Sequence, residues 1–248
     1  MSKRILLEVA YDGTNYHGWQ LQPNASSIEA VLNEHLSALL KEDIKVIGAS
    51  RTDAGVHAKG NIAVFDTNAR IPAEKISYAL NQRLPEDIVI RQSREVDPDF
   101  HPRRQKSVKH YSYQIWHDRF PMPIGQNYML FLYIPLDIDK MQQAASYLIG
   151  EHDFTSFCSI HTEVVDKVRT ILSITVEEQD SVLKIDVTGT GFLYNMVRII
   201  AGTLLEVGKG TYPPEHLKEI LEARDRALAG PTVPAKGLTL VSYSFERM

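Results

Sequence analysis

Apolar residues follow two periods along the chain, about every second residue and about every third or fourth. The first period is typical of half-buried strands and the second of amphipathic helices. In the N-terminal part of the chain these patterns alternate in the order β-α-β-β-α-β. The predicted elements are strands over 4–10, 44–48, 61–66 and 88–92 and helices over 28–39 and 72–80.

The C-terminal part repeats this order with different residues and one additional helix. The predicted elements are strands over 109–116, 169–177, 182–188 and 238–245 and helices over 138–149, 192–207 and 214–224. Two successive βαββαβ units predict an α+β fold of two ferredoxin-like halves, over residues 1–104 and 105–248. This duplication is inferred from element order alone, because the halves share no obvious sequence repeat.

The predicted helix over 192–207 is apolar on almost every face, which predicts that it is buried. Arg198 lies in its middle. A guanidinium keeps its charge, so Arg198 either meets a carboxylate or reaches solvent along its stem. Asp53 is the carboxylate that we expect to be its partner. The alternative is that Arg198 simply reaches the surface.

Asp53 lies in a stretch of small residues between the predicted strands over 44–48 and 61–66. Arg51 and His57 are close to it in sequence, and Gly55 and Gly60 follow it. Loops held between strands are places where a fold can present a reactive group. An Asp-Ala-Gly sequence is equally typical of a simple turn.

A local group of cations precedes the predicted strand over 109–116. Arg103, Arg104, Lys106 and Lys109 occur there without an acid, and Tyr111 and Tyr113 follow. Cations neutralise phosphates and aromatic rings stack on unpaired bases, so Arg103, Lys109 and Tyr111 are candidate RNA contacts. The alternatives are a solvated basic surface and tyrosines that fill the core.

Composition narrows the class of protein without identifying it. The 248 residues are 44% hydrophobic and 23% charged, with a net charge of −4 and one cysteine, Cys158. An intrachain disulfide is therefore impossible, and we expect cytoplasmic surroundings and no membrane span. Neither a complete dinucleotide-binding motif, nor a P-loop, nor a dense metal-ligand cluster is present.

Five stretches together resemble the bacterial tRNA pseudouridine synthase A family. They are Arg51–Ala58, Lys109–Tyr113, Gly150–Phe157, Gly191–Arg198 and Leu228–Leu238. This chain has Ser50 where the family usually has glycine, and Val233 where alanine is common. Nearly the whole chain is covered, since the resemblance begins at Tyr11-Asp12-Gly13-Thr14.

The resemblance implies two ferredoxin-like halves whose sheets meet at a central RNA-binding cleft. It also implies a homodimeric isomerase that converts uridine to pseudouridine at positions 38 to 40 of the tRNA anticodon stem-loop, without cofactor or metal. Asp53 would be the nucleophile, Arg198 its partner and Tyr111 a contact to the uracil. Arg51 would help to extrude the base. The competing hypotheses are a non-catalytic RNA-binding module and a hydrolase with an Asp nucleophile.

Overall fold

The computed structural model describes residues 2–160, 162 and 164–245. The chain forms two compact units. The first contains the residues up to Ser107 and those from Leu240 onward, and the second runs from Val108 to Thr239. The last strand thus groups with the first unit, whereas the expected boundary after residue 104 assigns it to the second half. Its aromatic rings explain the grouping, because Phe245 packs edge-on against Phe100 at 5.2 Å.

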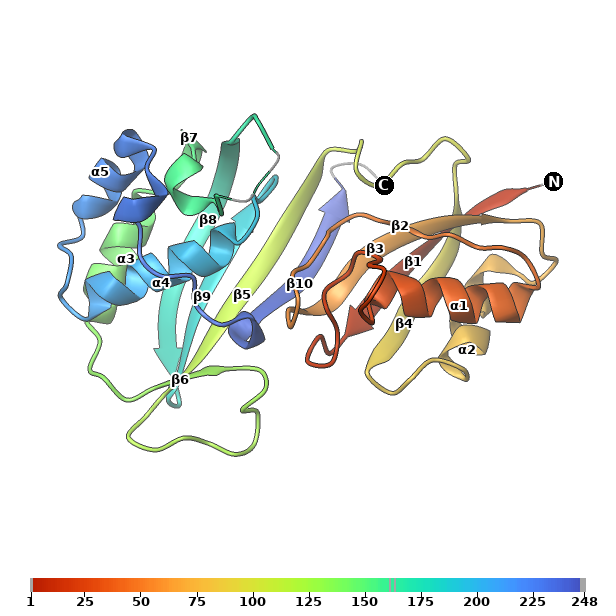
Figure 1. Ribbon diagram of the computed structural model, residues 1–248, viewed down its shortest axis with the longest axis horizontal. Coiled ribbons are helices and arrows are strands. Elements are labelled where there is room, and N and C mark those ends of the chain that lie inside the picture. The colour runs from red at the N-terminus through yellow and green to blue at the C-terminus, as the bar shows by residue number, and fades with distance from the viewer. Residues whose placement is uncertain (1, 161, 163, 246–248) are drawn as a thin grey trace. The chain divides into compact units, whose positions relative to one another are not determined.

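The first unit combines a mostly antiparallel sheet with two helices (Figure 1). Strand β1 pairs antiparallel with β3 on one side and with β4 on the other, β2 pairs with β3, and the path runs β4-β1-β3-β10. Helix α2 packs against β4 and α1. The elements are β1 (Lys3–Tyr11), α1 (Ile28–Leu40), β2 (Ile47–Gly48), β3 (His57–Thr67), α2 (Ile76–Asn81), β4 (Ile88–Val96) and β10 (Leu238–Phe245).

Most predicted elements of this unit are confirmed, and several differ in length, such as β4, which extends four residues beyond its predicted end to Val96. Ser27 caps α1, since its hydroxyl accepts a hydrogen bond from the Ala30 amide at 3.3 Å. The strand predicted over 44–48 is reduced to β2. Strand β3 begins at His57, four residues before the predicted start, because the segment after His57 pairs with Tyr11 of β1 although it is not apolar.

The second unit also has a sheet with helices packed against it (Figure 1). The strand path is β5-β9-β8-β7 with antiparallel pairs, and β6 pairs parallel with β5. Helix α3 packs against β8, α4 and α5. The elements are β5 (Ser107–His117), β6 (Leu130–Leu132), α3 (Ile138–Ser146), β7 (Gly150–Asp153), β8 (Val168–Gln179), β9 (Val182–Gly189), α4 (Met196–Gly208) and α5 (His216–Ala223).

Two predictions for the second unit are wrong in detail. The helix predicted over 138–149 ends at Ser146, and Gly150, at φ +110°, opens strand β7, which was not predicted. The helix predicted over 192–207 begins at Met196, because Asn195 adopts a left-handed conformation with φ +61°. An apolar run alone does not mark such a start. The burial predicted for this helix is confirmed.

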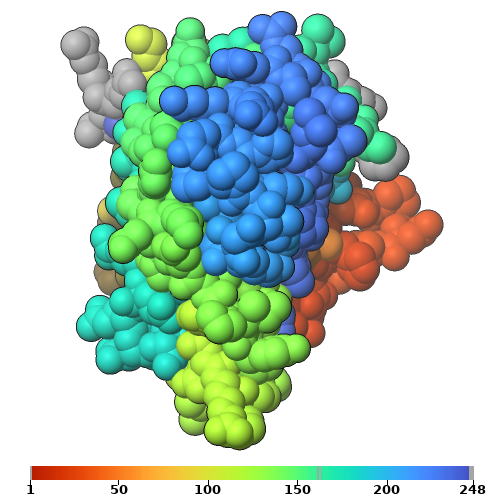
Figure 2. Space-filling model, turned by 90° about the vertical axis from the view of Figure 1, so that its left-hand side faces the viewer, coloured from red at the N-terminus to blue at the C-terminus, as the bar shows by residue number. Residues whose placement is uncertain are grey.

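The segment between β5 and β6 carries a group of exposed large apolar side chains. It forms the yellow-green protrusion at the lower end of the second unit in Figure 2. The exposed side chains of this segment and the residues just after it are Phe120, Met122, Ile124, Tyr128, Tyr133 and Ile134. Several exposed large apolar side chains within one segment are typical of interaction sites.

Among the described residues, none of the helices combines the length and the apolar character that a membrane crossing requires.

Candidate active site

Asp53 lies in the loop of residues 49–56 that joins β2 to β3, called here the Asp53 loop. The loop is bonded to the segment after β1 at two points. The Trp19 amide donates to the Thr52 carbonyl at 3.0 Å, and the Gly55 amide donates to the Tyr16 carbonyl at 3.2 Å. These bonds lie on either side of Asp53 and therefore fix the backbone that carries its half-buried side chain.

Two glycines allow this close approach of two loops. A Cβ on Gly18 would lie 2.5 Å from the Thr52 carbonyl oxygen, and one on Gly13 would overlap the Val56 carbonyl. Gly18 also has φ +87°, a conformation that L residues with a side chain rarely adopt. The Asp53 loop is therefore held by backbone contacts that only glycine permits.

Asn61 is the side chain that binds the start of the Asp53 loop. It is fully buried, its Oδ1 accepts the Ser50 amide at 3.2 Å, and its Nδ2 donates to the Ser50 carbonyl at 2.9 Å. Its Nδ2 also lies 3.3 Å from the Tyr11 hydroxyl, which is 2.7 Å from Thr52 Oγ1. Sequence reasoning missed this role. The signal was a polar residue at the head of the apolar run Asn61–Phe65.

Asn61→Ala is expected to lower the melting temperature by about 5–10 °C, because it removes two buried hydrogen bonds to the backbone of Ser50. Turnover should fall as well, since the loop loses its fixed geometry. Thermal unfolding followed by circular dichroism measures the first effect. Asn68→Ala is the matched control, because Asn68 is exposed and its backbone amide, which the substitution keeps, donates to the Glu42 carboxylate. A melting temperature equal to that of Asn68→Ala would contradict the role of Asn61.

His57 ties the end of the Asp53 loop to the segment after β1. Its Nδ1 accepts the Gly13 amide at 3.0 Å and lies 3.1 Å from an Asp12 carboxylate oxygen. A ring nitrogen that accepts an amide hydrogen carries no proton of its own. Both contacts hold this buried ring against the segment after β1.

Helix α4 carries Arg198, which is half-buried. Its Nε donates to the Val233 carbonyl at 2.8 Å, and its Nη1 donates to Asn195 Oδ1 at 2.8 Å. The segment that supplies Val233 is bound to α4 again where the Gly230 amide donates to Thr203 Oγ1 at 2.9 Å. Two bonds of different direction fix the plane of the guanidinium, so Arg198 has a defined orientation.

Tyr111 and Tyr113 lie on the same face of β5 and are both buried. Tyr113 donates from its hydroxyl to the Pro234 carbonyl at 2.9 Å, and burial raises the pKa of that hydroxyl. Tyr111 packs edge-on against Phe192, with ring centroids 5.2 Å apart. Tyr113 thus fills the core, as the alternative interpretation had it. The role of Tyr111 as a base contact stays a prediction.

The predicted basic group is divided between the two units. Arg103 is exposed, as are Arg104 and Lys106, and all three belong to the first unit. Lys109 is half-buried on β5 of the second unit. Burial, and after it the positive charges of Arg104 and Arg103, lower the pKa of His101. The exposed cations therefore keep an electropositive surface at the end of the first unit.

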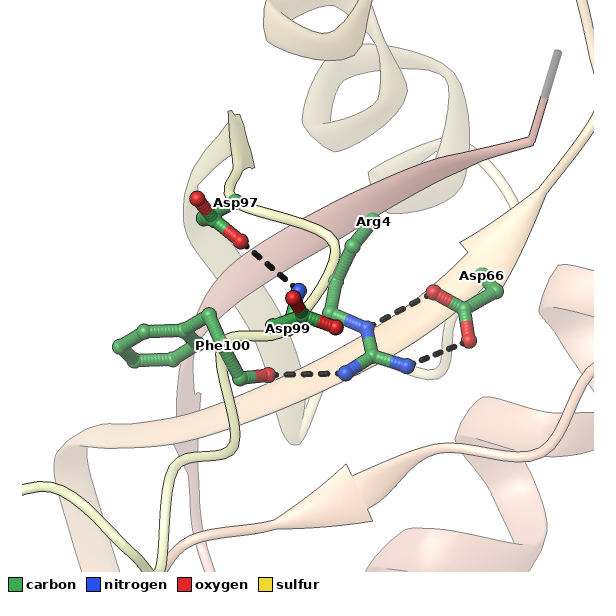
Figure 3. Close-up of polar contacts among 5 residues, drawn as sticks. All are labelled: Arg4, Asp66, Asp97, Asp99 and Phe100. Atoms are coloured by element: carbon green, nitrogen blue, oxygen red, sulfur yellow. Dashed lines mark hydrogen bonds and ion pairs between the residues drawn. The ribbon is translucent and has the colours of Figure 1, made fainter.

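Arg4 anchors the segment that leads into these exposed cations (Figure 3). Its guanidinium binds both oxygens of Asp66, at 2.8 and 2.7 Å, and donates to the Phe100 carbonyl at 2.9 Å. The Asp99 amide donates to the Asp97 carboxylate at 2.8 Å and forms the preceding turn. The segment that precedes Arg103 is thus held against β1 and β3.

The structure thus builds two sets of side chains, each within one unit. Arg51, which is exposed, and Asp53 share one loop of the first unit. The second unit carries Lys109, Tyr111 and Arg198, the last of these beside the residues 229–234. Within the part of the chain that the structure describes, no group of three or more His, Cys, Asp or Glu side chains is placed to hold a metal ion.

Comparison with known proteins gives one consistent result. The family model described as tRNA pseudouridine synthase matches residues 8–103 and 144–246. The tRNA pseudouridine synthase A of Acetivibrio thermocellus is 46% identical over 243 residues, which cover 98% of this chain and all of that protein. The Brevibacillus brevis protein of the same name is 49% identical over 238 residues, covering 96% and 98%. Among solved structures, a Cbf5-Nop10-Gar1 complex aligns with 82% of this chain and 54% of that chain, at 15% identity and a TM-score of 0.34.

Proposed function

The chain belongs to the tRNA pseudouridine synthase family, whose enzymes isomerise uridine to pseudouridine, and we propose that its targets are positions 38 to 40 of the anticodon stem-loop. In this reaction the bond between N1 of uracil and C1′ of ribose breaks, and C5 then bonds to C1′. The hydrogen on C5 leaves as a proton and N1 takes up a proton. The oxidation state does not change and no group is transferred away. The protein has to expose the base, supply one nucleophile and move one proton.

We propose Asp53 as the nucleophile, and the observation that carries this assignment is the rigid attachment of its loop. The Asp53 loop is bonded on both sides of the carboxylate and at its start by Asn61. A fixed backbone lowers the cost of placing a reactive oxygen against a bound base. A surface turn would need none of this buried support.

The other proposed roles follow the chemistry of each side chain. Arg198 would act with the Asp53 carboxylate and stabilise its charged form. Arg51, which is exposed on the same loop, would bind phosphate while the base is extruded. Tyr111 would contact the uracil, and Arg103 and Lys109 would bind the RNA backbone.

Release of tritium from C5 of labelled uridine in tRNA tests this function. We expect the protein to release the label without added cofactor, because replacement of C5–H by C5–C1′ must liberate it. Chemical mapping of the product should place pseudouridine at positions 38 to 40. A non-catalytic RNA-binding module would bind the tRNA and release nothing, and a hydrolase would leave the C5 label in place. Either result would contradict the proposal.

We also propose that the chain consists of two ferredoxin-like halves, over residues 1–104 and 105–248. The first unit supports this with the element order β1-α1-β2-β3-α2-β4 and the strand neighbours β4-β1-β3-β2. In the second, α3 lies in sequence between β5 and β8, and α4 follows β9. We further propose that the halves enclose the RNA-binding cleft.

A homodimer that works in the cytoplasm completes the proposal. The exposed apolar side chains between β5 and β6 support a subunit contact, because such surface is costly to leave in water. Two subunits would also combine their cationic surfaces on one tRNA, which offsets the net charge of −4. Light scattering should give twice the mass of the 28.0 kDa chain, and a monomer at micromolar concentration would contradict this.

A further inference from the structure

Two cations from different strands meet at one end of the second unit's sheet. Lys109 of β5 pairs with Gly189 of β9, and Gly189 pairs in turn with Ile171 of β8. Arg169 lies two residues before Ile171 on the same strand. Lys109 and Arg169 thus lie on the two strands that flank this end of β9.

The Arg169 side chain lies along the loop that follows β9. A Cβ on Gly191 of this loop would be 3.4 Å from Arg169 Cδ and 3.5 Å from its Nε. Arg169 Nη1 donates to two backbone carbonyls, of Asp166 at 3.2 Å and of Val168 at 2.5 Å. Within the described residues, no carboxylate forms an ion pair with Arg169. The guanidinium group of Arg169 is thus oriented by neutral backbone carbonyls.

The two charges influence each other. Burial, and after it the charge of Arg169, lower the pKa of the Lys109 amine. Neighbouring like charges that are partly removed from water repel, and an anion placed between them relieves this cost. Two such cations can therefore share a bound anion.

Aromatic side chains that could contact a nucleotide lie near Lys109 and Arg169. Phe192 stands over Gly189, since a Cβ there would be 3.1 Å from Phe192 Cζ, and its ring contacts Tyr111. Tyr111 also lies two residues from Lys109 on the same face of β5. Two cations beside a pair of aromatic rings combine phosphate binding with contact to a base or ribose.

We propose that Lys109 and Arg169 together bind one backbone phosphate of the RNA, beside Tyr111 and Phe192. This inference rests on the proposed function and adds Arg169, which no motif of the sequence singled out. The two side chains are assigned to one phosphate because they lie on the strands at either side of the same end of β9, with Lys109 opposite Gly189 and Arg169 beside Gly191.

The salt dependence of tRNA binding tests the proposal. We compare Lys109→Met, Arg169→Gln and the double variant with Lys184→Gln, which removes an exposed cation of β9 in the same sheet. Each phosphate contact contributes about 0.7–0.9 to the slope of log K against log salt. In the double variant we expect the slope to become shallower by the amount of about one phosphate contact, not two. Lys184→Gln should leave the slope unchanged. Arg169→Lys, which keeps the charge, should retain the slope.

Circular dichroism at the assay temperature establishes that each variant is folded. If Arg169→Gln does not fold, the salt slope of Lys109→Met is compared with that of Lys184→Gln. A slope unchanged in these variants would overturn the phosphate site, and a loss of two contacts would overturn the shared phosphate. Tritium release by the unmodified protein distinguishes a failure of the phosphate site from a failure of the proposed function. If it releases tritium while the slopes are unchanged, only the phosphate site fails. If it releases none, the proposed function fails.

Discussion

Asp53→Asn is expected to slow tritium release by roughly 10⁴-fold or more, with little change in tRNA affinity. An amide is nearly isosteric with the carboxylate but is neutral and a poor nucleophile, so only the chemical step loses its reactive group. Loss of one essential member of a catalytic group typically costs about this much in kcat. Single-turnover measurement with tritiated tRNA gives the rate, and filter binding gives the dissociation constant.

The control for this prediction is Asp43→Asn, which removes an exposed carboxylate from the segment just before β2. It should release tritium at the unmodified rate. Because the bonds that hold the Asp53 loop run through its backbone and through Asn61, the Asp53 variant should also melt at the unmodified temperature. Tritium release by folded Asp53→Asn at a rate close to that of the control would rule out the nucleophile.

The elements with a strong local pattern were predictable from the sequence. Helix α1 is marked by its Ser27 cap and its apolar stripe, and β10 matches its predicted range because its ends coincide with its apolar run. The boundaries that were missed depend on non-local pairing. The His57 end of β3 is a strand because it pairs with β1, and β7 is a strand because it pairs with β8. Nothing in their own residues indicates this.

The candidate site was predictable where a single residue contradicts its surroundings. Arg198 is such a residue in an apolar helix, and the structure holds it by Val233 and Asn195. The supports were not predictable in the same way. Asn61 acts by reaching both backbone groups of Ser50, and Arg169 joins Lys109 only because β9 lies between their strands. Contacts of this kind follow from sheet register, which no local motif records.

Arg198→Lys is expected to lower turnover by about 10²–10³-fold while the tRNA dissociation constant changes by less than about threefold. A fixed donor aimed at charge in a reaction contributes about this much. Lysine keeps the positive charge but lacks the planar fork that reaches the Val233 carbonyl and Asn195 Oδ1 in different directions. Its ammonium group would therefore lack the orientation of the guanidinium. Arg198→Met should lose at least as much, since it removes the charge too.

A double variant distinguishes cooperation with Asp53 from an independent role. If the guanidinium acts through the Asp53 carboxylate, Arg198→Met should cost almost nothing further in a protein that already carries Asp53→Asn, because residues that act as a unit are not additive. Additive losses would mean that Arg198 acts on its own. Equal losses of turnover and tRNA affinity in Arg198→Met would make Arg198 a binding residue instead. The tritium assay and filter binding are applied to the unmodified protein, the two single variants and the double variant. Together they decide whether Arg198 acts through the Asp53 carboxylate.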